Sequence, residues 1–141
     1  MALTPGGAYT LLNHGTILNR AGRPEEAIPI FQKAIRLNPF GPPSLYREYG
    51  TALRNVGRFE EAISAYKKAI QITPDNFIAH LGLVATYSLM DREQEARAEA
   101  AEVLRINPKF SLDKWAATPG RFRDQSARDR IVGGLRKAGL K

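Results

Sequence analysis

The chain has 141 residues, of which 43% are hydrophobic and 25% charged, so it is long and apolar enough to form one domain or one small repeat array. It contains no cysteine, which excludes disulfide scaffolds, thiol nucleophiles and cysteine-ligated zinc sites. The net charge of +7 lies almost entirely in residues 109–141, which hold nine Lys and Arg against three Asp and Glu.

The first seven residues, MALTPGG, have neither the basic nor the apolar stretch of a signal peptide, and we expect residues 1–7 to be a linker or an artificial start. No apolar run approaches the roughly 20 residues that a helix needs to cross a bilayer. Together with the lack of cysteine, these features favour a cytoplasmic protein.

The middle of the chain is repetitive. Residues 22–39 and 57–74 are identical at ten of eighteen positions, with a constant offset of 35 residues. A third and more divergent copy spans residues 91–108. Each copy follows a matching segment of fourteen residues, so the repeated unit has two halves joined by a short turn. We therefore predict three units, at residues 8–42, 43–76 and 77–110.

Both halves of each unit are predicted to be helices, which makes the fold class all-α. Apolar residues of the second copy recur at spacings of three and four, as in an amphipathic helix. They are Phe59, Ala62, Ile63, Tyr66, Ala69, Ile70 and Ile72. Gly22 and Gly57 stand where the first helix must end and the chain must turn. A proline closes each unit, because proline cannot continue a helix; these are Pro39, Pro74 and Pro108.

This 34-residue helix–turn–helix pattern, with small residues at fixed positions, resembles the tetratricopeptide repeat. The second unit carries the signature most fully, with Tyr46, Tyr49, Gly50, Leu53, Ala62, Tyr66, Ala69 and Pro74. The first unit matches with Leu11, Gly15, Leu18, Ala27, Phe31, Ala34 and Pro39. The third departs from it, since Val84 replaces the small residue, Ala100 the aromatic and Val103 the alanine. The resemblance implies a right-handed superhelical solenoid whose first helices line a concave groove.

Residues 111–141 are predicted to form capping helices at the end of the array. Ser111 is placed to cap a short helix that carries Leu112 and Trp115, and a last helix is expected near residues 125–138. The final stretch GLRKAGL resembles the C-terminal ends of tetratricopeptide regions in bacterial class III adenylate cyclases and in some winged-helix regulators. That resemblance implies a regulatory module of a larger bacterial signalling protein.

No catalytic or cofactor-binding pattern is present, so we predict a non-enzymatic protein without cofactor or metal. The two histidines, His14 and His80, are 66 residues apart and are expected to be structural. The sequence has no H-x-x-x-H, no phosphate-binding glycine loop and no nucleophile elbow. Pairs of glutamates recur at the same place in two units, which favours a role at helix starts over a glycosidase pair. They are Glu25–Glu26 and Glu60–Glu61.

The function that remains is recognition of another protein. In the family that the repeats resemble, positions two, five, nine and twelve of each first helix face the groove, and these positions with their neighbours give a candidate peptide-binding set. The set is Tyr9, Leu12, Asn13, Thr16, Asn19, Arg47, Thr51, Arg54, Asn55, Ile78 and Leu81. We expect the two leucines and Ile78 to contact apolar side chains of the peptide. Asn19, Arg47, Arg54 and Asn55 are expected to bind its backbone or an acidic group.

The chaperone-tail type of groove is excluded by the residues at its clamp positions. Such repeats hold a C-terminal carboxylate with a Lys–Asn–Asn–Lys–Arg set. The matching positions here are Leu12, Thr16, Glu48, Ile78 and Gly82. None supplies the required side chain, and Glu48 would repel a carboxylate.

Two alternative functions remain open. A nucleic acid could bind the basic tail, where aromatic side chains are available for stacking. The residues concerned are Lys114, Trp115, Arg121, Phe122, Arg123, Arg128, Arg130, Arg136, Lys137 and Lys141. Self-association through apolar residues of the first helix, namely Tyr9, Leu11 and Leu12, would make the protein an assembly scaffold.

Overall fold

The computed structural model describes residues 5–118 and 125–141, and its regular elements there are all α-helices. They are α1 (Pro5–Arg20), α2 (Pro24–Leu37), α3 (Pro43–Asn55), α4 (Phe59–Ile72), α5 (Phe77–Leu89), α6 (Glu93–Ile106), α7 (Leu112–Ala116) and α8 (Gln125–Lys137). The predicted all-α class is confirmed. α1 begins at Pro5, three residues before the repeat pattern starts, because proline fits the first turn of a helix.

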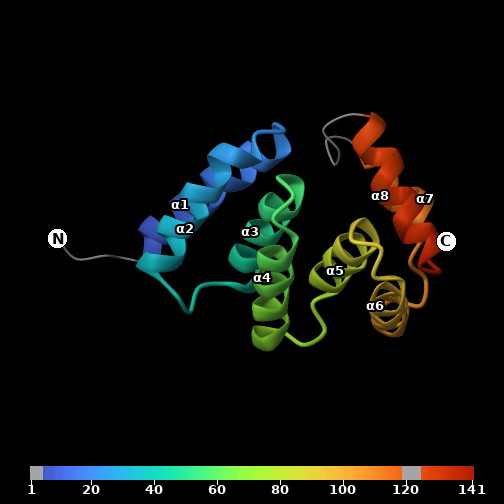
Figure 1. The fold of residues 1–141 in the computed structure, drawn as a ribbon. Helices are drawn as coiled ribbons and strands as arrows, with labels where there is room; N and C mark the ends of the chain where they lie inside the picture. Colours follow the sequence, from blue (N-terminus) through green and yellow to red (C-terminus); the bar gives the residue numbers. More distant parts are fainter. Residues whose placement is uncertain (1–4, 119–124) are drawn as a thin grey trace.

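Consecutive helices pair into hairpins that follow one another across the molecule (Figure 1). The hairpins are α1–α2, α3–α4 and α5–α6. Each second helix packs on the first helix of the next unit, α2 on α3 and α4 on α5, so that the buried side chains form one continuous core. The predicted solenoid of three helical hairpins is therefore confirmed.

Each hairpin turns at a residue in the left-handed backbone region. The φ angle is +74° at Gly22, +86° at Gly57 and +58° at Asp91. In every turn the amide of the next residue donates to the carbonyl five residues earlier, at 2.9 Å. This geometry confirms the two glycines as helix-ending residues. Asp91 adopts a conformation in which a glycine would be unstrained.

The hairpins are held close by aromatic rings packed against glycines. A Cβ atom placed on Gly15 would lie 2.5 Å from Phe31, and one placed on Gly50 would lie 3.1 Å from Tyr66. Each ring therefore occupies the space of a missing side chain. Gly82 of α5 approaches the same Tyr66 ring, which is thus enclosed between α3 and α5. The recurring small residues set the spacing between helices.

In the third unit the large and small core side chains have exchanged places between the two helices. Val84 stands at the position of the small residue and Ala100 at the position of the aromatic, and both are buried. The small Ala100 of the second helix is compensated by the larger Val84 of the first, and exchanges that conserve side-chain volume are tolerated in cores. The departure of this unit from the repeat signature is therefore compatible with the same packing.

An arginine just before each second helix binds the glutamate three residues further on. Arg58 Nε donates to Glu61 Oε1 at 2.8 Å, and Arg92 Nε donates to Glu95 Oε1 at 2.6 Å. The hydrogen bonds from Arg58 hold the pKa of Glu61 below its usual value, and those from Arg92 lower the pKa of Glu95. The glutamates at the helix starts thus take part in specific ion pairs.

The C-terminal segment folds back onto α5. Ser111 caps α7 as predicted, because its side chain accepts a hydrogen bond from the amide of Lys114 at 3.3 Å. α8 lies where the last helix was expected and packs along α5. There Ser88 Oγ donates to the carbonyl of Gly134 at 3.2 Å. The end of the third hairpin is therefore covered by the chain itself.

Candidate functional site

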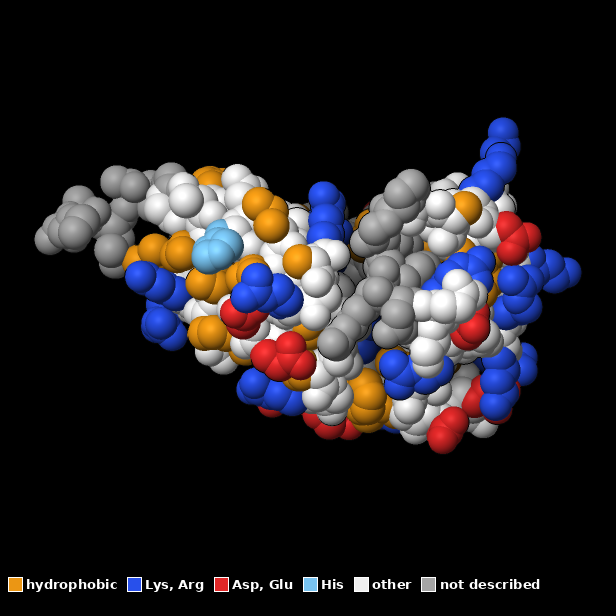
Figure 2. Space-filling model, turned by 90° about the horizontal axis from the view of Figure 1, so that it is seen from above, with side chains coloured by type: hydrophobic (Ala, Val, Ile, Leu, Met, Phe, Trp, Pro, Cys, Tyr) orange, Lys and Arg blue, Asp and Glu red, His pale blue; other side chains and the backbone are white. Residues whose placement is uncertain are grey.

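The first helices α1, α3 and α5 end on one side of the molecule, which is the upper side in Figure 1. A view onto that side shows Lys and Arg side chains on its surface (Figure 2). The last turns of α1 and α3, which carry Asn19 and Arg54, lie on this side. Polar residues of the candidate groove are thus brought to one face.

Asn19 joins α1 to α3 through Glu48. Its Nδ2 donates to the carbonyl oxygen of Glu48 and to the carboxylate Oε2, at 3.0 Å each. Arg47 Nη1 lies 3.8 Å from the other carboxylate oxygen. The acid that would repel an anionic ligand is therefore half-buried and already engaged by an amide and a guanidinium.

A second group forms around the hydroxyl of Tyr66. The ring belongs to α4 and is fully buried, yet its hydroxyl oxygen lies 2.8 Å from Thr51 Oγ1 and accepts from Arg54 Nη1 at 3.3 Å. Sequence reasoning placed Tyr66 only in the core and missed this role. The available signal is the change from Phe31 in the first unit, since only tyrosine brings a hydroxyl to this position.

The predicted groove residues differ widely in exposure. Those at the surface are Tyr9, Asn13 and Asn55, and those partly buried are Thr16, Asn19, Arg47, Thr51, Arg54 and Ile78. Leu12 is 8% exposed and Leu81 is 2% exposed, so both belong to the core. The apolar contacts expected from these two leucines are therefore not available to a ligand.

His80 is a structural residue that ties α5 to its surroundings. Its Nδ1 lies 2.6 Å from Glu99 Oε2 on α6, and its Nε2 lies 2.9 Å from the carbonyl oxygen of Pro74. The expectation of a buried structural histidine is confirmed here. His14 is instead exposed on α1.

Other kinds of site have less support. In the described part of the chain, no group of three or more His, Asp and Glu side chains is placed to hold a metal ion. None of the helices described is both long and apolar enough to span a bilayer. Among the tail residues considered for nucleic acid, Arg121, Phe122 and Arg123 lie outside the described residues. Arg136 lies 3.3 Å from Asp113, so part of the tail's charge is engaged within the chain.

Two family descriptions match the sequence. Residues 8–40 match the family described as tetratricopeptide repeat, and residues 50–90 match a family described as TPR repeat. The two stretches together make up more than half of the chain. No curated protein matches the sequence.

The fold is similar to several solved structures. The first TPR of Spaghetti (RPAP3), bound to HSP90 peptide SRMEEVD, has a TM-score of 0.74 and 19% identity, covering 98% of this chain and 94% of that one. MamA has a TM-score of 0.71 and 24% identity, covering 95% and 77%. YrrB, described as a TPR protein with an unusual peptide-binding site, has a TM-score of 0.69 and 23% identity, covering 73% and 53%. Likenesses at this level of identity establish the fold.

Proposed function

Because the chain is built of tetratricopeptide repeats, we propose that it is a non-enzymatic module that binds a peptide segment of a partner protein on the face of α1 and α3. One observation carries the proposal. Asn19 Oδ1 and Arg54 Nε are buried atoms without a hydrogen-bond partner among the described residues, although both side chains are partly exposed. Buried polar atoms are nearly always paired in native proteins, so two unpaired atoms call for an explanation.

A bound peptide supplies what both atoms lack. Asn19 Oδ1 accepts a hydrogen bond and Arg54 Nε donates one, so a backbone amide and a carbonyl or carboxylate oxygen would satisfy the pair. The exposed amide of Asn55, whose Oδ1 accepts a hydrogen bond from Arg54 Nη2 at 3.5 Å, adds a further donor beside Arg54. Since Arg47 and Arg54 place positive charge on this face, the favoured peptide carries an acidic side chain.

The HSP90 peptide SRMEEVD is the ligand of the Spaghetti (RPAP3) domain, and we do not propose it as a ligand of this chain. The clamp positions here hold Leu12, Thr16, Glu48, Ile78 and Gly82, of which Leu12 is buried. Glu48, which is bound by Asn19, offers no hydrogen-bond donor to a terminal carboxylate. Both features favour an internal peptide segment over a free C-terminal carboxylate.

The test is a pull-down from cell lysate with wild-type protein and the double variant Arg47→Glu/Arg54→Glu. A matched control is Lys33→Glu/Arg36→Glu, which makes the same charge change at exposed positions of α2. We expect partners that are lost with the groove variant and kept with the control, each variant being checked for helicity by circular dichroism. Partners kept by both variants would place binding on the other face or on the tail.

We also propose that the module regulates a larger cytoplasmic bacterial signalling protein. The support is the GLRKAGL stretch, Gly134–Leu140, with its resemblance to the ends of repeat regions in class III adenylate cyclases. The test is to sequence the complete reading frame that encodes this chain. A reading frame that also encodes a nucleotide cyclase or a winged-helix domain would support the proposal, and a frame that encodes neither would contradict it.

Self-association is a second candidate function, favoured by exposed apolar residues on α1. Ile17 is 65% exposed and Tyr9 is 48% exposed. A second copy stacked against this helix would cover them. Light scattering at high protein concentration tests the idea, with Ile17→Glu as the disrupting variant. A monomeric wild type would contradict it.

A further inference from the structure

The outer face of the array carries a cleft between α2 and α4, with α3 at its floor. Its cavity has a volume of about 600 Å³, which lies in the range of ligand pockets. The lining residues are Ile35, Tyr46, Tyr49, Leu53, Glu61, Ser64, Ala65, Lys67, Lys68 and Gln71. The floor is aromatic and aliphatic, and the polar side chains come from α4. None of the candidate groove residues lines this cleft.

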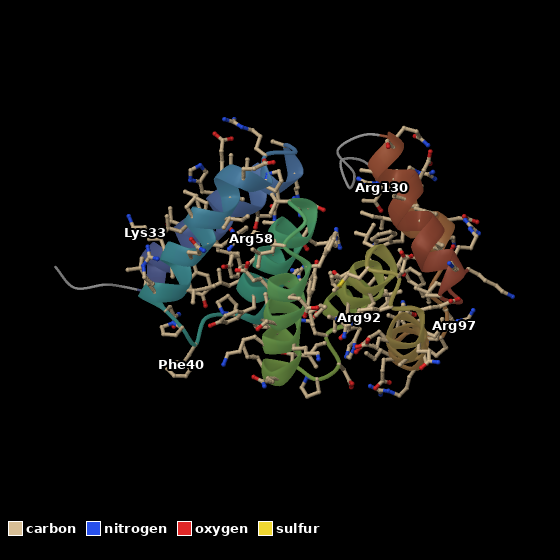
Figure 3. The ribbon with its side chains drawn as sticks, viewed as in Figure 1. Lys33, Phe40, Arg58, Arg92, Arg97 and Arg130 are labelled. Carbon is tan, nitrogen blue, oxygen red and sulfur yellow. The ribbon has the colours of Figure 1, made fainter. Side chains whose placement is uncertain are left out.

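The corresponding surface between the second and third units is bridged by ion pairs. Arg92 Nη1 lies 3.1 Å from Glu60 Oε1, and Arg105 Nη2 lies 2.8 Å from Asp75 Oδ1. Figure 3 shows Arg92 reaching between the two helices. Each pair joins the second unit to the third. On this surface the second and third units are thus tied together by the chain's own charges.

Neither pair exists between the first and second units. In the repeat register, the position of Asp75 is taken by Phe40 and that of Arg105 by Gln71. Arg58, which corresponds to Arg92, binds only Glu61 of its own helix among the described residues. The cleft between α2 and α4 therefore remains open.

Phe40 lies on the loop between α2 and α3, next to a residue that contacts the cleft wall. The preceding residue, Pro39, accepts a hydrogen bond from the hydroxyl of the cleft residue Tyr46 at 2.5 Å. Phe40 itself is 92% exposed and projects from the loop between α2 and α3 (Figure 3). An exposed aromatic side chain is a feature of protein-binding surfaces.

The charge of the cleft is positive. Lys68 forms no ion pair with any described residue, whereas its counterpart in the third unit is Glu102. Lys67 lies near Glu95, because its charge contributes to the lowered pKa of that carboxyl. Glu61 is neutralised by two hydrogen bonds from Arg58, at 2.8 and 2.7 Å. An anionic occupant is therefore complementary to the α4 wall.

We propose that this cleft is a second docking site, which binds an acidic partner segment that places an apolar side chain over Tyr49 and Leu53. Its carboxylates would face Lys68. A second copy of this chain is disfavoured as occupant, because each copy carries a net charge of +7. The partner segment is thus acidic and amphipathic.

The test uses a fluorescein-labelled decapeptide of alternating Glu and Leu with one Phe, and an analogue in which Gln replaces every Glu. Fluorescence anisotropy measures binding to the wild type and to two cleft variants. Lys68→Glu reverses the charge of the unpaired lysine, and Phe40→Asp/Gln71→Arg installs the counterpart of the Asp75–Arg105 ion pair. The control is Lys33→Glu, at a residue on the side of α2 that faces away from α4 (Figure 3).

We expect saturable binding of the acidic peptide, at least tenfold weaker with either cleft variant and within twofold of wild type with the control. In the groove variant Arg47→Glu/Arg54→Glu, which removes any binding at the face of α1 and α3, the peptide should still bind, and Lys68→Glu should still weaken that binding at least tenfold. Equal binding of the Gln analogue, or loss of binding only with the groove variant, would overturn the proposal. A wild type that sediments as a dimer, and becomes monomeric with Phe40→Asp/Gln71→Arg, would overturn it in favour of a second copy.

Discussion

Gly82→Ala adds one methyl group where the structure has no room for it. The new Cβ would lie 2.5 Å from Tyr66 Cζ and 2.9 Å from its hydroxyl oxygen. The ring cannot move away, because it packs on Gly50 and its hydroxyl lies 2.8 Å from Thr51 Oγ1. Overpacking costs about 1–3 kcal/mol, and loss of the hydroxyl's hydrogen bond adds about 1 kcal/mol. Since alanine favours a helix over glycine by about 1 kcal/mol, we expect a net destabilisation of about 2 kcal/mol.

The assay is urea unfolding followed by far-ultraviolet circular dichroism. The matched control is Gly133→Ala in α8, where a Cβ would meet no atom within 4 Å. This control should be more stable than wild type by about 0.5–1 kcal/mol. In a Tyr66→Leu background the effect of Gly82→Ala should fall below about 1 kcal/mol, because leucine has no ring at that position. A Gly82→Ala protein as stable as the control would refute the packing of α5 against Tyr66.

Three further predictions concern single side chains. His80→Ala removes both hydrogen bonds of a buried ring and should lower the free energy of unfolding, measured by urea titration, by about 2 kcal/mol. The control His14→Ala, at an exposed histidine, should lower it by less than about 0.5 kcal/mol. Asp91→Gly relieves the strain of a left-handed backbone and should raise the free energy of unfolding by about 0.5 kcal/mol in the same titration. A lower free energy of unfolding would show that Asp91 is not strained. Arg58→Gln should reduce the acid sensitivity of the fold. Because the folded pKa of Glu61 is lowered from 4.5, its contribution is present above that pH and is lost as pH falls through the lowered value. The drop in urea midpoint from about pH 7 to about pH 3 should therefore be smaller than in wild type.

The sequence predicted the array because its signals are local. Gly22 and Gly57 end helices through their own backbone freedom, and apolar residues at spacings of three and four define each buried face. These features repeat in register, so the hairpins and their order could be predicted without any knowledge of distant contacts. Asp91 escaped notice because an aspartate gives no comparable signal for a left-handed turn, although it tolerates one.

The candidate site was harder to predict because it depends on contacts between units. Position within a helix assigned Leu81 to the groove, yet its burial is fixed by neighbouring elements. Tyr66 was assigned to the core, and the reach of its hydroxyl to α3 follows from the close approach permitted by Gly50. The open outer cleft depends on which residues stand opposite one another in successive units. That comparison requires the structure.

The most direct test of binding at α1 and α3 is photo-cross-linking from that face. Benzoylphenylalanine placed at Asn55, which is exposed beside Arg54, is irradiated in cell lysate, and the products are compared with those of the same group placed at Lys33. The account predicts a discrete cross-linked partner at Asn55 that disappears in the Arg47→Glu/Arg54→Glu background and is absent at Lys33. Cross-linking only at Lys33, or products at Asn55 that survive the double substitution, would contradict it.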